Sequence, residues 1–526
     1  MARYIDKGNM GFREARNSEY VDKSGLISVV NSTLGTKYKF SCVSRARRFG
    51  KSMAAEMLMA YYDRSCDSRE LFEDLEIAHN PSFEQHLNKY PVIYLDMTEF
   101  ITDYRNDAAI VTHIQEKIKA DIETAYPQLP PEHDETFMSY LQRLSLDAGD
   151  RFIMIIDEWD AICREFDPKS PVMDNYIDWL RRMFKSASAT EVFAGVYMTG
   201  ILPIKKYDTQ SALNNFTEYS MIDPGNMARY FGFAHDEVEA LARKWGMDVS
   251  ELEKWYDGYQ IGEELSMFNP NSVMQAILRH RCHSYWGRTA AYDTVATYIK
   301  MDFEGLRDDI TQMLAGQRTR VNTGTFLNDM HDVSSRDDVL TLLIHLGYLS
   351  FEWNSSCCYI PNLEVSKELE NAIRLNNWRP VVDAIQQSEQ LLEALLRGDA
   401  DSVARGVETV HRQEVSLFKY NDENSMACVI SLAFYAARND FHVHREYQTG
   451  DGYADLVLIP RKNVAKPAVV IELKYDQTVT TAITQIKQKH YPEKIQDYTG
   501  NMLLVAITYH RDSKQHECHI EHYTKP

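Results

Sequence analysis

The chain has 526 residues, of which 44% are hydrophobic and 25% are charged. This composition is that of an ordinary globular protein and excludes a disordered or fibrous chain, while the length suggests about two to four domains. The formal net charge of −20 argues against a protein coated for non-specific binding to DNA.

No segment of the sequence predicts an export signal or a membrane anchor. The N-terminal residues MARYIDKGNM lack an apolar core, and no stretch approaches the roughly 18 apolar residues that a membrane span requires. The eight cysteines include no C-x-x-C pair, which favours a reducing compartment. We therefore expect a cytoplasmic protein with no membrane partner.

The first strong pattern predicts a strand, a basic loop and a helix. Residues 38–43 are apolar, β-branched or aromatic, as in a strand, and strong helix formers follow the loop. Gly50, Lys51 and Ser52 match the second half of the phosphate-binding loop G-x-x-x-x-G-K-[ST]. In such a loop Lys51 would reach the β- and γ-phosphates, and the Ser52 hydroxyl would ligate Mg²⁺. Because Arg45 replaces the first glycine of the pattern, an ordinary βα turn stays an alternative on this motif alone.

Further apolar runs predict a mostly parallel sheet. Strand-like segments alternate with helical ones, an order that places helices on both faces of the sheet. The predicted strands after the first span residues 91–100, 152–156, 192–198 and 216–222.

Two of these strands end in residues suited to ATP hydrolysis. Asp157 and Glu158 close one strand, as in a Walker B segment. Such an aspartate holds the Mg²⁺ shell, and the glutamate can orient or deprotonate the attacking water. Thr199 follows the next strand, where a polar residue can sense the γ-phosphate. A lone threonine after a strand is usually a turn residue, but its position after the Walker B segment favours the sensor. Together with the phosphate loop, these residues predict an ATPase that uses Mg²⁺.

Four motifs in combination resemble the AAA-ATPase-like family of bacterial and archaeal proteins. They are YVDKS, SRARRFGKS, IIDEWD and TGILPI, at residues 20–24, 44–52, 155–160 and 199–204. The family's phosphate loop typically reads R-P-R-R-F-G-K-S, so the resemblance implies that Arg45, Arg47 and Arg48 belong to the nucleotide site. Ala46 replaces the proline and should loosen the turn slightly. For residues 20–24 the resemblance implies packing near the nucleotide base, and a simple N-terminal brace is the alternative.

The middle of the chain predicts a helical connecting region. Apolar residues recur there at helical spacing, and strand signals are few except around residues 347–359. Asn269 and Pro270 form the start signal of one of these helices.

A second candidate site lies near the C-terminus. Residues 451–476 predict a hairpin of two apolar strands, with Asp455 at the start of the first. Glu472 and Lys474 end the second strand on one face, because side chains alternate along a strand. Two carboxylates can hold Mg²⁺, and a lysine beside them can help to form hydroxide. This arrangement resembles the PD-(D/E)xK nuclease superfamily, with Asp455 as the motif aspartate and Glu472 and Lys474 as its (D/E)xK pair.

The resemblance extends to the helices beside this hairpin. It implies that Glu423 is the acidic residue that precedes the nuclease core and that Gln485 and Tyr491 belong to the helix after it. Lys487 and Lys489 on that helix are candidate phosphate contacts. From residue 420 onward, 12 Lys/Arg nearly balance 13 Asp/Glu, so we expect polyanion contacts there and at the arginines of the phosphate loop.

The sequence thus predicts an α/β protein with three parts. We expect an AAA-ATPase-like P-loop domain at residues 1–223, a helical lid or connecting region at 224–415 and a restriction-endonuclease-like domain at 416–526. The predicted function is ATP binding and hydrolysis coupled to Mg²⁺-dependent cleavage of nucleic acid, with DNA as the expected type. The alternative is an ATP-gated switch or scaffold whose C-terminal domain binds nucleic acid or a partner without cleaving it. A homo-oligomer is a further candidate partner arrangement.

Overall fold

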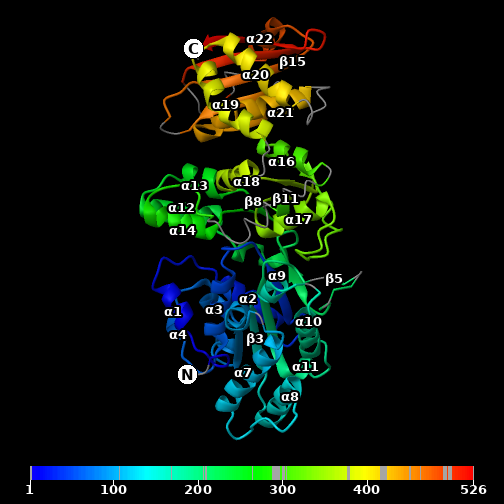
Figure 1. Ribbon diagram of the computed structural model, residues 1–526. Coiled ribbons are helices and arrows are strands. Elements are labelled where there is room, and N and C mark those ends of the chain that lie inside the picture. Colours follow the sequence, from blue (N-terminus) through cyan, green and yellow to red (C-terminus); the bar gives the residue numbers. More distant parts are fainter. Residues whose placement is uncertain are drawn as a thin grey trace. The chain divides into compact units, whose positions relative to one another are not determined.

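The computed structural model forms two compact units, one made of residues 1–287 and 320–364 and the other of residues 288–319 and 365–526 (Figure 1). The division into three domains stays a prediction. The structure describes residues 3–524 except for 106, 168, 205, 208–209, 212, 263–264, 287–296, 299–302, 304, 376–378, 415–422, 449–451, 462–463, 490–494 and 496–499.

A five-stranded parallel sheet forms the centre of the first unit. Its order is β2-β3-β4-β1-β7, and every neighbouring pair is parallel, which confirms the predicted sheet. All side chains of β1 and β3 are buried, because helices cover both faces. The strands are β1 (Phe40–Ser44), β2 (Val92–Asp96), β3 (Phe152–Asp157), β4 (Phe193–Gly200) and β7 (Thr217–Tyr219).

One strand is shorter than the sequence predicted. The expected strand at residues 91–100 ends at Asp96, and Met97 begins helix α6 (Met97–Tyr104). The Asp96 side chain accepts a hydrogen bond from the Thr98 N–H at 2.9 Å and so caps this helix. The expectation that residues 97–100 extend the strand was therefore wrong.

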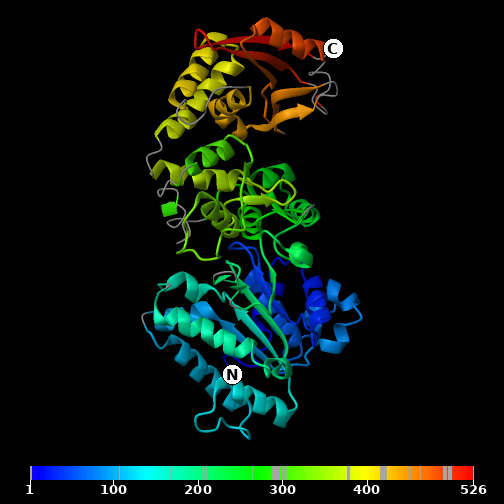
Figure 2. The same ribbon diagram turned by 90° about the vertical axis from the view of Figure 1, so that its right-hand side faces the viewer.

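Two hydrophobic clusters hold helices against the two faces of this sheet (Figure 2). Helices α7 (Ile110–Ala125), α8 (Phe137–Ala148) and α10 (Pro171–Phe184) pack on one face. Helices α2 (Gly25–Thr33) and α3 (Lys51–Tyr62) pack on the other. The carboxyl ends of the strands thus meet at one edge of a three-layer core.

The remaining helices of this unit are mostly short. They are α1 (Met10–Arg16), α4 (Arg69–Phe72), η1 (Glu76–His79), α5 (Phe83–His86), α9 (Ala161–Glu165), α11 (Ala189–Val192), η2 (Gly225–Tyr230), α12 (His235–Trp245), α13 (Val249–Tyr256), α14 (Pro270–Arg279) and α17 (Arg336–Leu346). Asn269 caps α14, as predicted, by accepting the Ser272 N–H at 3.2 Å.

Short hairpins complete the first unit. The sequence predicted strand structure near residues 347–359, and β11 pairs there with β12. It did not predict the pair β8 and β9, which lies in the region expected to be helical. The short strands are β5 (Lys206–Tyr207), β6 (Gln210–Ser211), β8 (Tyr259–Ile261), β9 (Leu265–Met267), β11 (Ser350–Glu352), β12 (Cys357–Tyr359) and, where the two units meet in the sequence, β10 (Thr319–Arg320).

The second unit contains a mixed sheet in the order β13-β14-β15-β16-β17. Strands β14 and β15 form the predicted antiparallel hairpin, and β15 pairs with β16 in parallel across a helical crossover, α22. The strands are β13 (Phe441–Gln448), β14 (Tyr453–Pro460), β15 (Ala468–Tyr475), β16 (Met502–His510) and β17 (Gln515–Tyr523).

Helix α22 (Val479–Gln488) packs on one face of this mixed sheet through Ile483 and Ile486. The other helices of the unit are α16 (Leu306–Leu314), α18 (Leu363–Leu375, which begins in the first unit), α19 (Arg379–Leu396), α20 (Ala400–Glu414), α21 (Glu423–Ala433) and η3 (Tyr435–Asn439). In the part of the chain that the structure describes, none of the helices has the length and apolar character needed to cross a bilayer.

Candidate functional sites

A cavity of about 920 Å³ opens at the carboxyl edge of the parallel sheet. Among the described residues that line the cavity, positively charged side chains outnumber negatively charged ones, although the whole chain has a net charge of −20. The cations are Lys23, Arg47, Arg48, Lys51, Arg105 and Arg164, and the acids are Glu19, Glu158 and Glu165. A cleft with an excess of one sign of charge attracts ligands of the opposite sign, so this cavity favours an anion.

The phosphate loop forms one wall of the cavity. Gly50 lies immediately before α3 with φ +89°, a left-handed conformation that favours glycine. Lys51, at the N-terminus of this 12-residue helix, is only 5% exposed and donates to the Ala46 carbonyl at 3.1 Å. Burial lowers the pKa of Lys51. An anion in this cavity would therefore meet both the N–H groups of the helix N-terminus and the lysine.

The three loop arginines have different surroundings. Arg47 and Arg48 line the cavity, and Arg48 also donates to the Tyr285 and Trp286 carbonyls, each at 2.6 Å. Arg45 does not line the cavity: it is fully buried and donates to the Tyr219 carbonyl at 2.8 Å. Burial lowers the pKa of Arg45 to about 10. The structure thus brings two of the three arginines to the predicted nucleotide site.

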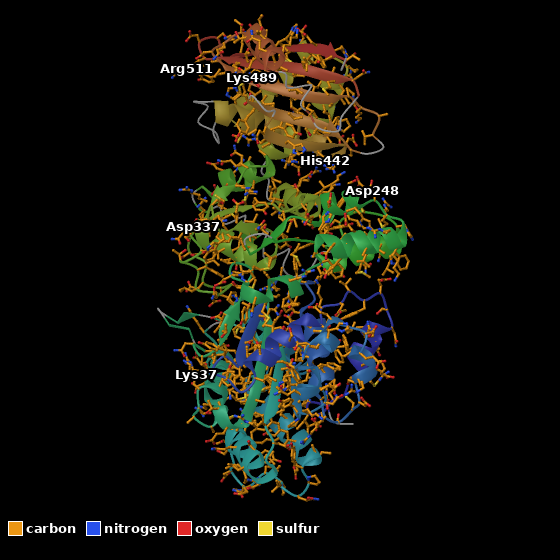
Figure 3. The ribbon with its side chains drawn as sticks, turned by 180° about the vertical axis from the view of Figure 1, so that it is seen from behind. Lys37, Asp248, Asp337, His442, Lys489 and Arg511 are labelled. Atoms are coloured by element: carbon orange, nitrogen blue, oxygen red, sulfur yellow. The ribbon has the colours of Figure 1, made fainter. Side chains whose placement is uncertain are left out.

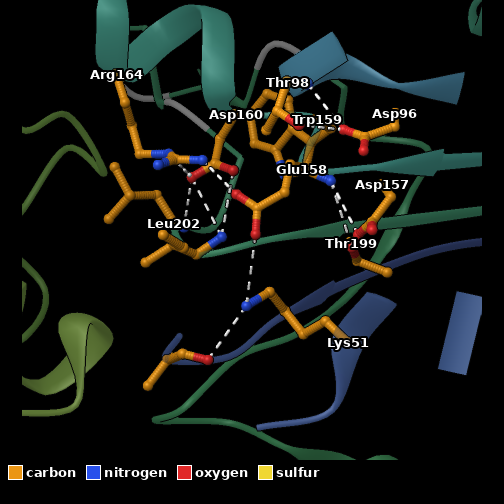
Figure 4. Close-up of polar contacts among 12 residues, drawn as sticks. Lys51, Asp96, Thr98, Asp157, Glu158, Trp159, Asp160, Arg164, Thr199 and Leu202 are labelled. Atoms are coloured by element: carbon orange, nitrogen blue, oxygen red, sulfur yellow. Dashed lines mark hydrogen bonds and ion pairs between the residues drawn. The ribbon is translucent and has the colours of Figure 1, made fainter. Parts of the chain in front are cut away.

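The ends of β3 and β4 form the acidic side of the site (Figure 4). The hydroxyl of Thr199 donates to the Asp157 carboxylate. Burial raises the pKa of Asp157, while hydrogen bonds from Ser52 and Thr199 oppose this rise. The two predicted Mg²⁺ ligands, Ser52 and Asp157, therefore lie together. Thr199 itself is fully buried and contacts Asp157 instead of the cavity wall.

Glu158 lies on the cavity wall between two cations. One carboxylate oxygen is 3.8 Å from Lys51 Nζ, and the other accepts a hydrogen bond from Arg164. Burial opposes its ionisation, but Lys51 and Arg164 outweigh this effect and lower the pKa of Glu158. The side chain is therefore a fixed carboxylate beside the phosphate-loop lysine.

The second candidate site lies on the α22 face of the mixed sheet. Lys474 Nζ is 3.0 Å from Glu472 Oε1, and the Gln485 amide also donates to that oxygen. Asp455 accepts the Leu473 N–H at 2.7 Å, which brings it to the same strand pair. The hairpin and α22 thus assemble four of the predicted residues.

Glu472 is the most unusual member of this group. It is 1% exposed, and its Oε2 atom has no hydrogen-bond partner among the described residues. Burial and the neighbouring Asp455 raise the pKa of Glu472 to about 7. Since a buried polar atom without a partner is costly, Oε2 is well suited to bind a cation.

Comparison with protein families matches both regions. Residues 8–210 match the family described as "Predicted AAA-ATPase", and residues 421–518 match the PD-(D/E)XK nuclease superfamily. The chain carries an AAA-ATPase-like domain and a C-terminal PD-(D/E)XK domain.

Similarity also extends over nearly the whole chain. An uncharacterized protein in the vnfD 5′ region of Azotobacter chroococcum mcd 1 is 22% identical over 525 residues, with 95% of each chain covered. Two Aeropyrum pernix structures are more distant. The ORC2 protein in ADPNP-ADP complexes is 11% identical, with 69% of this chain and 98% of that chain covered and a TM-score of 0.30. The ORC1 protein in complex with DNA is 13% identical, with 71% and 97% covered and a TM-score of 0.24. TM-scores this low establish no shared fold.

The other predicted residues of the PD-(D/E)XK domain differ in their surroundings. Lys487 forms an ion pair with Glu521 at 2.5 Å. Lys489, labelled in Figure 3, follows the end of α22 and lies near enough to Glu472 for its charge to oppose the rise that burial causes in the pKa of that carboxyl. Glu423 begins α21, but its side chain falls outside the described part. Tyr491 also lies outside the described residues.

Sequence reasoning missed Arg164 in the AAA-ATPase-like domain. This residue lines the cavity and contacts both Glu158 and Asp160. The available signal was its spacing, four residues after Asp160, which is typical of an ion pair on a helix.

The N-terminal segment lies between the cavity and helix α12, and its packing near the nucleotide base stays a prediction. Tyr20 and Val21 line the cavity, and Lys23 forms a half-buried ion pair with Glu237 at 2.7 Å. The segment therefore both borders the cavity and braces α12.

Proposed function

We propose that the AAA-ATPase-like domain binds and hydrolyses ATP. The observation that supports this most strongly is the cationic cavity in which Lys51 and the N-terminus of α3 face the carboxylate of Glu158. A triphosphate would satisfy the excess of positive charge, and the volume of about 920 Å³ leaves room for the nucleoside.

Each residue of this site has a distinct proposed role. Lys51 and the loop amides bind the β- and γ-phosphates, with Arg47 and Arg48 as further cationic contacts. Ser52 and Asp157 would hold Mg²⁺, which supplies charge neutralisation at the phosphates. Arg45 supports the loop from the protein interior, because its hydrogen bonds go to the backbone carbonyls of Ser44 and Tyr219.

Glu158 is the proposed group that orients and deprotonates water. The Glu158 carboxylate lines the cavity, 3.8 Å from Lys51 Nζ, and from there it could accept a proton from a water molecule bound beside the phosphates. Thr199 contributes by holding Asp157 through its hydroxyl. We therefore revise its proposed role from direct γ-phosphate sensing to support of the proposed magnesium ligand.

For the PD-(D/E)XK domain we propose Mg²⁺-dependent cleavage of nucleic acid, with DNA as the expected substrate. The unpartnered Oε2 of Glu472 and the carboxylate of Asp455 would hold the cation, which supplies Lewis-acid activation of water. Lys474 is placed to stabilise negative charge near Glu472, and Gln485 orients that carboxylate. The proposed domain boundaries stay at residues 1–223, 224–415 and 416–526, and we propose a cytoplasmic location.

The nuclease proposal is tested by incubating the full chain with single- and double-stranded DNA and RNA, with Mg²⁺ or Mn²⁺ and with or without ATP. Asp455→Ala, Glu472→Ala and Lys474→Ala should each abolish cleavage and leave ATP hydrolysis intact. Asp440→Ala is the matched control, because that carboxylate pairs with Lys466 at 2.5 Å outside the proposed nuclease site. No cleavage by the unmodified protein would favour the ATP-gated switch or scaffold, and cleavage by all three variants would place the catalytic groups elsewhere.

A further inference from the structure

A buried cluster of three charged side chains follows β3. Arg164 on α9 hydrogen-bonds to the Glu158 carboxylate, and its Nε lies 3.2 Å from Asp160 Oδ2. The side chains of Arg164 and Asp160 are 9% and 1% exposed. Burying charges costs free energy unless they are paired, so the arginine compensates both acids at once.

Asp160 connects this cluster to the segment after β4. Its carboxylate accepts the Ile201 N–H at 3.2 Å and the Leu202 N–H at 2.9 Å. A Cβ atom at Gly200 would lie 2.7 Å from Asp160 Oδ1, so this close approach requires glycine. Through Asp160, Arg164 is therefore anchored to a fixed part of the backbone.

Glu158 needs such an anchor. Its φ of +53° is an uncommon conformation for a residue with a side chain, and surrounding contacts must hold it. One of its cationic neighbours, Lys51, is the group that binds phosphate in the proposed reaction. Once Lys51 turns to the phosphate, the hydrogen bond from Arg164 remains to fix the carboxylate (Figure 4).

We propose that Arg164 is a positioning residue for ATP hydrolysis. It holds the Glu158 carboxylate in place through its own ion pair with Asp160, so that the carboxylate faces the attacking water. This inference rests on the proposed ATPase function. Although Arg164 lines the cavity, its guanidinium is paired with the Glu158 and Asp160 carboxylates, so we infer that it acts through Glu158 and not by binding the phosphates. The predicted effect of its loss is on turnover and not on ATP affinity.

The test compares kcat and the ATP dissociation constant in Arg164 variants of the full chain. Arg164→Gln removes the charge and should lower kcat by about 100-fold, the loss expected when a reacting group is displaced by about 1 Å, with ATP affinity unchanged. Arg164→Lys keeps the charge but loses the planar fork of donors, so its kcat should lie between those of Arg164→Gln and the parent. Arg182→Gln is the control, because Arg182 is 80% exposed and pairs with Asp178 on α10.

Parental kcat in Arg164→Gln would overturn the inference, and so would a loss of ATP affinity as large as the loss of turnover. If Arg164→Gln does not fold, the lysine variant decides: reduced kcat with parental ATP affinity supports the inference, and parental kcat refutes it. Failure of the unmodified protein to hydrolyse ATP is a different result, because it would refute the proposed ATPase function itself.

Discussion

Replacing Gly347 by alanine should weaken both the fold and ATP binding. Gly347 ends α17 with φ +84°, and a Cβ atom there would lie 2.6 Å from the Ala46 Cβ of the phosphate loop. The same atom would lie 3.2 Å from the Trp286 ring. Since the Ala46 Cβ is fixed to the backbone, the loop must move, and the Ala46 carbonyl that accepts from Lys51 must move with it.

The size of this effect follows from two separate costs. The left-handed conformation costs an alanine about 1–2 kcal/mol relative to glycine. Overpacking adds about 1–3 kcal/mol, so Gly347→Ala should lower the free energy of unfolding by about 2–5 kcal/mol. Gly246→Ala is the matched control: Gly246 ends α12 with φ +68°, and a Cβ there would meet no atom within 4 Å. The free energy of unfolding of Gly246→Ala should therefore fall only by the cost of the left-handed conformation.

Urea unfolding of the two variants, with calorimetric titration of ATP, separates the two costs. We expect Gly347→Ala to unfold at a lower urea concentration than Gly246→Ala and to bind ATP more weakly than the parent. Gly246→Ala should keep parental affinity. Equal unfolding midpoints and equal ATP affinities in the two variants would refute the argued coupling between α17 and the phosphate loop.

Two further substitutions test individual carboxylates. Glu158→Gln should keep ATP bound while turnover is lost, because the amide cannot accept the proton and Asp157 stays in place; parental hydrolysis in a steady-state phosphate-release assay would show that another group is the base. Glu472→Gln should stabilise the fold at pH 8 by an amount on the order of 3 kcal/mol and have little effect at pH 5. The sign of this stability change follows from the pKa of Glu472, which burial and Asp455 raise to about 7 in the folded state. The free-energy cost of the buried charge therefore develops as the pH rises from the unfolded-state pKa of a glutamate to about 7. Urea unfolding without divalent cations at both pH values measures this difference, and a variant less stable than the parent at pH 8 would contradict it.

The parallel sheet could be predicted because its strands carry long apolar runs. In β3, for example, all six residues are buried, and the run ends directly at the acidic pair. The hairpin of β14 and β15 could be predicted for the same reason. Strands β8 (YQI) and β9 (LSM) could not, because neither belongs to an apolar run and both lie among helical patterns.

In the candidate sites, the sequence predicted which residues belong to a motif but not all of the contacts that their side chains make. The motif placed Arg45 with Arg47 and Arg48, yet its guanidinium turns inward to the Tyr219 carbonyl, which lies 174 positions further along the chain. No local pattern reports a contact of that kind. Arg164 was missed because its spacing of four residues from Asp160 is equally typical of a surface ion pair, and only the structure shows that its partners are largely buried.

Calorimetric titration of ATP with Mg²⁺ tests the central claim most directly. We expect the unmodified chain to bind ATP and Lys51→Ala to lose that binding, since Lys51 is the cation buried behind the phosphate loop. Lys117→Ala is the control, because Lys117 pairs with Asp103 on the outside of the domain. Unchanged ATP affinity in Lys51→Ala, or no binding by the unmodified chain, would contradict the assignment of this cavity as an ATP site.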